Sequence, residues 1–153
     1  MKKHGILDIS QQYAVIAALA IWMGGLSFYG LVVVPTGAEL LGSIQQGFVT
    51  RQVTSSLNLI GCAALAILLW DVIRQRRKLL GTTWIVMLAT QIALMAIHPQ
   101  LDKMLNPADQ EVLDESRFHA LHEVYLTITG CQWTAALIHL ALTLWSWGAS
   151  RLS

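Results

Sequence analysis

The sequence predicts an all-α integral membrane protein built as a bundle of four transmembrane helices. Its composition is the first reason, since 55% of the 153 residues are apolar and only 12% are charged. A soluble domain carries about 25% charged residues, so most of this surface faces something other than water. The second reason is that the apolar residues form blocks separated by short polar segments. The length fits a single domain over residues 1–153.

Each apolar block is long enough to cross a bilayer once, because a hydrocarbon core of about 30 Å needs about 20 apolar residues in a helix. The first block contains no charged residue. The predicted spans are residues 13–34, 53–73, 79–97 and 120–147. The glycine-containing, polar segment 35–52 is predicted to be a loop. Four crossings place both termini on one side of the membrane.

The lysine and arginine residues indicate which side this is, because basic residues close to membrane spans stay in the cytoplasm. Three of the ten basic residues lie on the side opposite the termini, namely Arg51, Lys103 and Arg117. The other seven lie on the side of the termini: Lys2, Lys3, Arg74, Arg76, Arg77, Lys78 and Arg151. We therefore expect cytoplasmic N- and C-termini in a multi-pass protein of the cell (inner) membrane. The first span is longer than the apolar core of a signal peptide, so we expect it to be retained.

The connection of residues 99–117, between the third and fourth spans, is acidic and carries the signals of a helix start. Asn106 is a favourable N-cap, Pro107 suits the first turn, and Asp109 is an acid near the positive end of a helix. The fourth helix is therefore predicted to begin near Pro107 and to extend on the outer side of the membrane.

A group of outer histidines is the first candidate site. His119, His122 and Glu123 share one face of the fourth helix, because they are spaced three and four residues apart. His98 closes the third span at the same level. Imidazole and carboxylate groups are competent ligands for zinc or copper, and histidines from two helices can bind haem iron. The alternative is a structural role, with hydrogen bonds to the acidic loop or to lipid headgroups.

Two ionisable residues inside the spans form the second candidate site. A rise of 1.5 Å per residue places Asp71 and His139 at about the same depth, near the inner surface. An ionisable group in a span usually faces the bundle and finds a partner, so an Asp71–His139 pair is predicted. The functional interpretation is a proton relay or a small-ligand contact. The alternatives are a pair that only determines helix register, or an Asp71 that reaches toward the basic inner loop. Cys62 and Cys131 have no metal or redox spacing and are predicted to be packing residues.

Three segments resemble a family of small bacterial membrane proteins. They are WMGGLSFYGLVVVP from Trp22, IHPQLDKML from Ile97 and RFHALHEVY from Arg117. This pattern resembles domain of unknown function 4149, which is similar to the human transmembrane protein 205 group. The residues that match are Trp22, Gly24, Gly25, Pro35, Pro99, Phe118 and His122, whereas His119 and Glu123 are particular to this chain. The resemblance implies a four-helix membrane fold, and it implies no catalytic residue.

These observations favour a non-enzymatic membrane component, either an accessory or assembly subunit or a small ligand- or lipid-facing module. Ala20, Gly24 and Ser27 line one face of the first helix, and small residues let membrane helices approach closely. The expected partners are therefore the lipid bilayer and other membrane subunits or further copies of the chain. A net charge of +1 offers no surface for nucleic acid. The alternative is a redox or metal-handling protein that binds haem, copper or zinc, and a weaker one is a proton-coupled carrier.

Overall fold

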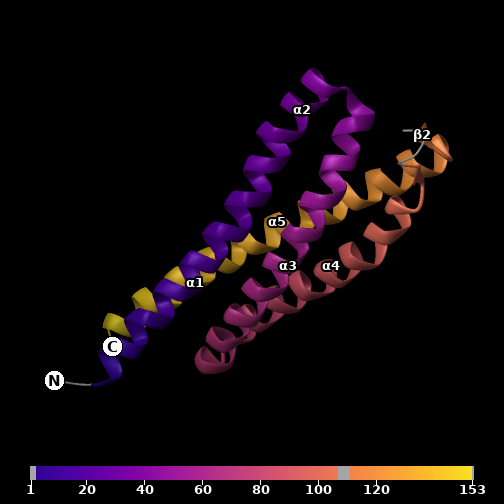
Figure 1. The fold of residues 1–153 in the computed structure, drawn as a ribbon. Helices are drawn as coiled ribbons and strands as arrows, with labels where there is room; N and C mark the ends of the chain where they lie inside the picture. The colour runs from indigo at the N-terminus through magenta and orange to yellow at the C-terminus, as the bar shows by residue number, and fades with distance from the viewer. Residues whose placement is uncertain (1–2, 107–110, 153) are drawn as a thin grey trace.

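A computed structural model describes residues 3–106 and 111–152, which are almost entirely helical (Figure 1). The helices are α1 (Lys3–Phe28), α2 (Val34–Leu41), α3 (Ser43–Gln75), α4 (Lys78–Asp102) and α5 (Glu115–Leu152). Three helical stretches are long and apolar enough to span a membrane, namely Ile9–Leu41, Ser43–Gln75 and Lys78–Asp102. The fourth long helix, α5, packs mainly against α4.

Both chain ends and the turn between α3 and α4 lie at one end of the bundle, as Figure 1 shows. We call this the inner end, after the predicted topology, and the opposite end the outer end. The stretch Ile9–Leu41, which covers most of α1 and all of α2, and the helix α3 have 33 residues each. At 1.5 Å per residue each is about 50 Å long, which exceeds a hydrocarbon core of about 30 Å. This hairpin therefore extends beyond the thickness of a bilayer core.

The first two helices join without a break through a π-helical turn at Tyr29–Val33. The cause is Pro35, which follows this turn at the start of α2. Proline has no N–H to donate to the carbonyl group four residues earlier, and its ring clashes with that carbonyl. The wider π-helical turn relieves the clash, and the N–H of Val34 donates to the carbonyl oxygen of Tyr29 instead.

The prediction of a loop at residues 35–52 was wrong. The segment itself is helical on both sides of Gly42, which alone separates α2 from α3. Gly42 has a φ of 88°, a backbone conformation that glycine adopts most easily. The polar residues of the segment serve helix pairing, since the Tyr29 hydroxyl donates to Thr50 Oγ1 at 3.0 Å and Gln46 Nε2 donates to Tyr29 Oη at 3.3 Å.

The inner turn has the predicted length and charge. α3 ends at Gln75, Arg76 adopts a left-handed conformation with a φ of 52°, and α4 begins at Lys78. The third predicted span lies inside α4, which continues through Pro99 to Asp102.

The fourth long helix begins later than predicted. Leu105–Asn106 (β1) pairs antiparallel with Glu111–Val112 (β2), so Asn106 lies in a short strand and is not an N-cap. Pro107 and Asp109 lie outside the described residues. α5 starts at Glu115, where Asp114 Oδ1 accepts the backbone N–H of Arg117 at 3.0 Å. A side-chain oxygen that satisfies an early N–H group is the physical requirement for a helix start, and Asp114 meets it.

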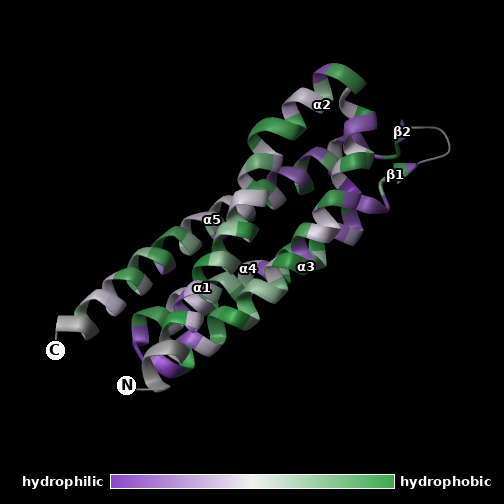
Figure 2. Ribbon diagram, turned by 60° about the vertical axis from the view of Figure 1, so that its left-hand side comes forward, coloured by the Kyte–Doolittle hydropathy of each residue, from purple (hydrophilic) through white to green (hydrophobic). Residues whose placement is uncertain are grey.

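The apolar core lies toward the inner end of the bundle. It is formed by Val15, Ala18, Leu19, Trp22, Ala64, Leu65, Leu68, Met87, Ala135, Ala136 and Trp147. These residues come from α1, α3, α4 and α5, so all four long helices meet there. In contrast, α2 at the outer end has no buried residue. Figure 2 shows hydrophobic turns along much of the length of the long helices.

Candidate functional site

The most extensive polar contacts inside the bundle surround Asp71, a residue of α3 that is only 1% exposed. Gln11 of α1 donates from Nε2 to Asp71 Oδ1 at 2.8 Å. Gln75, one turn further along α3, donates to the other carboxylate oxygen of Asp71. Arg74 donates to Gln11, and Ser146 of α5 donates to Gln75. We call these five residues the inner polar cluster, and it connects α1, α3 and α5.

The inner polar cluster satisfies a carboxylate that would otherwise be costly to bury. A buried acceptor without a donor loses its hydration free energy, whereas each oxygen of Asp71 accepts a hydrogen bond from a side-chain amide. The chemistry of this site is therefore that of a satisfied network, which holds helices in one register.

His139 does not pair with Asp71. It is 0% exposed, and its Nδ1 atom lies 2.7 Å from Thr83 Oγ1 of α4. The register of α5 explains the difference, because Ser146 and not His139 reaches the layer of Asp71. Ser146 lies seven residues beyond His139, which is about 10 Å along a helix. The estimate of depth from the span limits was too coarse to resolve this distance.

Two buried polar atoms on the same face of α5 have no hydrogen-bond partner among the described residues. They are Nε2 of His139 and Oγ1 of Thr143, and both side chains are 0% exposed. Residues four apart on a helix lie one above the other, so the two atoms belong to one face. A polar ligand or a water molecule at this place could form hydrogen bonds with both atoms.

The interior also contains a series of amides that the sequence interpretation missed. Gln132 of α5 donates to Gln91 Oε1 of α4 at 2.9 Å. Gln91 in turn donates to the backbone and side-chain oxygens of Asn58 in α3, both at 3.2 Å. Gln91 and Gln132 are isolated polar residues in apolar runs. That isolation was the available signal, since polar side chains in spans usually hydrogen-bond across helices.

Close helix packing accompanies these amides at Gly61. A Cβ atom at this position would lie 2.8 Å from Gln91 Oε1 and 2.8 Å from Trp22 Nε1. Only glycine leaves room for α1 and α4 to approach α3 at this point.

The outer histidines do not converge. His98 Nδ1 lies 3.4 Å from Asp102 Oδ2, which also accepts Arg51 Nε at 3.3 Å. On α5, the ring of His122 stacks on Phe118 with a centroid distance of 5.8 Å and an interplanar angle of 7°. The exposed residues His119 and Glu123 belong to the same helix.

No group of three His, Cys, Asp or Glu residues could hold a metal ion within the described ranges 3–106 and 111–152. The predicted ligand set of His98, His119, His122 and Glu123 is therefore not assembled there. Both cysteines are free, with Cys62 half-buried at 3.6 Å from Met95 Sδ and Cys131 exposed on α5.

Comparison of the chain with protein-family models, with curated proteins and with solved structures found no match to any of the three. The resemblance to domain of unknown function 4149 therefore stays a prediction from the short motifs around Trp22, Pro99 and His122.

Proposed function

We propose that this chain is a non-enzymatic membrane component that acts as an accessory or assembly subunit by packing against other transmembrane helices. In this proposal four helices cross the membrane, and the N- and C-termini lie in the cytoplasm. The inner end carries the basic turn formed by Arg74, Arg76, Arg77 and Lys78, next to both chain ends. The tendency of basic residues to remain cytoplasmic supports this orientation.

The fourth crossing in the proposal is α5, which is not among the three stretches that are long and apolar enough to span a membrane. Its 38 residues are about 57 Å long at 1.5 Å per residue, more than a bilayer core requires. Several of its polar residues are buried against α3 and α4 and would not meet lipid: Gln132, His139, Thr143 and Ser146. Burial of these groups supports a membrane-spanning α5 despite its composition.

The observation that carries the proposal is the exposed face of α5. Small residues recur there at spacings of three, four and seven residues: Thr127, Gly130, Thr134, Ala141 and Gly148, all of them exposed. We call this set the α5 small-residue face. Small residues allow the backbones of two membrane helices to approach closely, which drives association where lipid removes the hydrophobic driving force.

Large apolar side chains suited to lipid tails are exposed on both α3 and α5, for example Leu59 of α3 and Trp145 of α5, which are 73% and 66% exposed. On α1 the predicted small residues Ala20 and Gly24 are also exposed, which means that the chain does not use them for its own packing. Two of its helices thus retain close-approach surfaces that its own bundle leaves uncovered.

Substitution of Gly130 tests the proposal directly. A Cβ atom at Gly130 meets nothing within 4 Å, so Gly130→Leu does not disturb the fold of the chain itself. The leucine side chain would prevent a partner helix from approaching closely. We therefore expect the dissociation constant of the complex to rise about tenfold, corresponding to about 1.4 kcal/mol. The measurement is the mass of the particle extracted in mild detergent, as a function of protein concentration.

Ala66→Leu is the matched control, because Ala66 is an exposed small residue of α3 that lies outside the α5 small-residue face. We expect this variant to assemble like the wild type. A wild-type chain that is always a monomer on its own would contradict the proposal. Equal weakening by Gly130→Leu and Ala66→Leu would contradict the role of the α5 small-residue face.

A proton-coupled carrier is the second candidate, and the observation that favours it is the pair of unpartnered atoms on His139 and Thr143. An imidazole inside a bundle can accept and release a proton. Proteoliposomes that contain a pH-sensitive dye would test this, with His139→Gln and Asp71→Asn as variants. Proton movement above that of empty liposomes and lost in His139→Gln would favour the carrier. Movement that survives both substitutions would remove it.

A further inference from the structure

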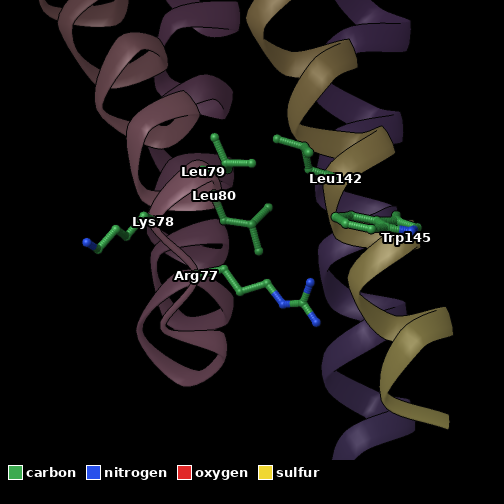
Figure 3. A pocket seen from close by; sticks show the side chains of 6 residues that line it. All are labelled: Arg77, Lys78, Leu79, Leu80, Leu142 and Trp145. Atoms are coloured by element: carbon green, nitrogen blue, oxygen red, sulfur yellow. The ribbon is translucent and has the colours of Figure 1, made fainter. Parts of the chain in front are cut away.

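A pocket of about 280 Å³ lies at the inner end between the start of α4 and the last third of α5 (Figure 3). The residues that line it are Arg77, Lys78, Leu79, Leu80, Leu142 and Trp145. We call it the inner pocket. None of its residues belongs to the inner polar cluster or to the α5 small-residue face.

The inner pocket has a cation on one side. The guanidinium carbon of Arg77 lies 5.7 Å from the centroid of the Trp145 ring, and Figure 3 shows the side chain of Arg77 extending toward α5. Within the described residues, Arg77 forms no salt bridge with a carboxylate. The ammonium group of Lys78 points away from α5 in the same view, so Arg77 is the cation that faces the pocket.

The other side of the inner pocket is apolar. Leu79 of α4 and Leu142 of α5 face each other across it in Figure 3, with Leu80 beside them. Trp145 is 66% exposed, and an amphipathic indole ring of this kind favours the level of lipid headgroups. The guanidinium group of Arg77 can donate two N–H groups from its edge to a phosphate while its planar face contacts the Trp145 ring.

We propose that the inner pocket binds an anionic phospholipid, with the phosphate at Arg77 and the acyl region along Leu79 and Leu142. The proposal rests on the proposed function in one respect, namely that the inner end lies at the cytoplasmic surface of a membrane. Charge complementarity identifies the occupant. An unpaired cation beside an apolar groove matches a negative headgroup attached to acyl chains, and basic pockets between helices on this side bind such headgroups.

The test is native mass spectrometry of the full chain in mild detergent, with phosphatidylglycerol and phosphatidylcholine supplied in equal amounts. We expect the wild type to retain phosphatidylglycerol preferentially. Arg77→Gln should lower its retention about fivefold, the factor that corresponds to the attraction of one basic residue for an anionic lipid. Arg77→Lys should retain part of the preference, since lysine retains the charge but not the planar pair of donors.

Arg76→Gln is the matched control. Arg76 is an exposed residue of the same turn and does not line the inner pocket, so the variant removes the same charge from the same region. We expect it to retain lipid like the wild type. An equal loss in Arg76→Gln and Arg77→Gln would overturn the proposal in favour of diffuse attraction by the basic turn. Equal retention of the two lipids by the wild type would also overturn it.

A third arm separates a lipid from a soluble phosphate. Glycerol 3-phosphate, which has the phosphate but no acyl chains, should not displace phosphatidylglycerol at equal concentration. Displacement would overturn the assignment of a lipid. The measurement is made on the chain alone in detergent, so its result depends neither on a partner protein nor on the orientation of the chain in a membrane. Gly130→Leu should therefore retain lipid while losing assembly, and Arg77→Gln should assemble while losing lipid, so that failure of either proposal is recognised separately.

Discussion

At the inner end of the bundle, Asp71 and His139 are buried and each has a side-chain partner on another helix. At the outer end, the same residue types behave differently. His119 and Glu123 are exposed, and the contact of His98 with Asp102 joins two residues of α4 itself. The inner end therefore connects its helices through buried ionisable residues. The outer end leaves His119 and Glu123 exposed and connects its helices through other polar pairs, Arg51 with Asp102 and Gln46 and Thr50 with Tyr29.

The difference follows from how many helices meet at each level. At the inner end α1, α3, α4 and α5 share one core, so a polar side chain has neighbours on several helices. At the outer end α2 buries no residue, and the hairpin of α1, α2 and α3 extends beyond the thickness of a bilayer core. A polar residue acquires a structural role only where a neighbouring helix is within reach of its side chain. Four sets of substitutions test this comparison.

The largest effect is expected for Gly61→Val. The new Cβ atom would lie 2.8 Å from both Gln91 Oε1 and Trp22 Nε1, so α1, α3 and α4 would have to separate. Overpacking of this kind lowers the free energy of unfolding by about 3 kcal/mol. Thermal unfolding in detergent measures the effect, with Gly130→Val as the control because a Cβ at Gly130 meets nothing within 4 Å. Equal stability of both variants would contradict close packing at the inner level.

A smaller effect is expected for Asp71→Ala. The substitution removes the carboxylate that accepts from the Nε2 groups of Gln11 and Gln75, so the N–H donors of one buried and one half-buried amide lose their acceptor. We expect the free energy of unfolding to fall by about 1–3 kcal/mol. Asp71→Asn keeps the shape and one oxygen acceptor and should lose less. A stability of Asp71→Ala equal to that of the wild type would mean that the inner polar cluster does not hold the helices together.

Thr143→Val should have little effect or should stabilise the chain. Its hydroxyl is buried without a partner among the described residues, and an apolar group of the same shape has no unsatisfied atom. Thr83→Val is the opposite case, because it removes the partner of His139, and we expect a loss of about 1 kcal/mol. Both values come from unfolding in the same detergent. A clear loss in Thr143→Val would indicate a bound water or ligand and would favour the carrier.

The smallest effect is expected at the outer end. His119→Ala and His122→Ala should leave the metal content per chain unchanged, because the described outer residues form no group that could hold a metal ion. Elemental analysis of untagged protein in mild detergent measures iron, copper and zinc. A near-stoichiometric ion that either substitution lowers about tenfold would contradict this expectation and support the redox or metal-handling alternative.

The apolar blocks were sufficient to predict a helical protein with long apolar segments, and three helical stretches are long and apolar enough to span a membrane. They also predicted the basic turn at Arg76, because a short charged interruption between two long apolar runs has few other conformations. The same reasoning failed at Gly42, where a polar segment formed helix. The polar residues of this segment were interpreted as the sign of a loop. In the structure, Gln46 and Thr50 instead form hydrogen bonds with Tyr29 in the preceding helical stretch.

The start of α5 and the candidate sites were less predictable. Asn106 and Asp114 are both acceptable N-caps by residue type, and strand pairing of Asn106 with Glu111 decided between them. The sequence identified Asp71 and His139 as buried ionisable residues but not their partners. Gln91 and Gln132 were missed because uncharged amides in apolar runs attracted no attention, although they connect α3, α4 and α5.

The sequence by itself determined where the long apolar blocks lie and that Asp71 and His139 fall inside them. These properties depend on periodicity and composition within a single helix, so they can be read locally. The tertiary structure decided which helices meet, at what register, and which faces stay uncovered. A shift of seven residues along α5 moves a side chain by about 10 Å. That is why Ser146 and not His139 reaches the layer of Asp71, and why the α5 small-residue face is exposed while Ala135 and Ala136 of the same helix are buried.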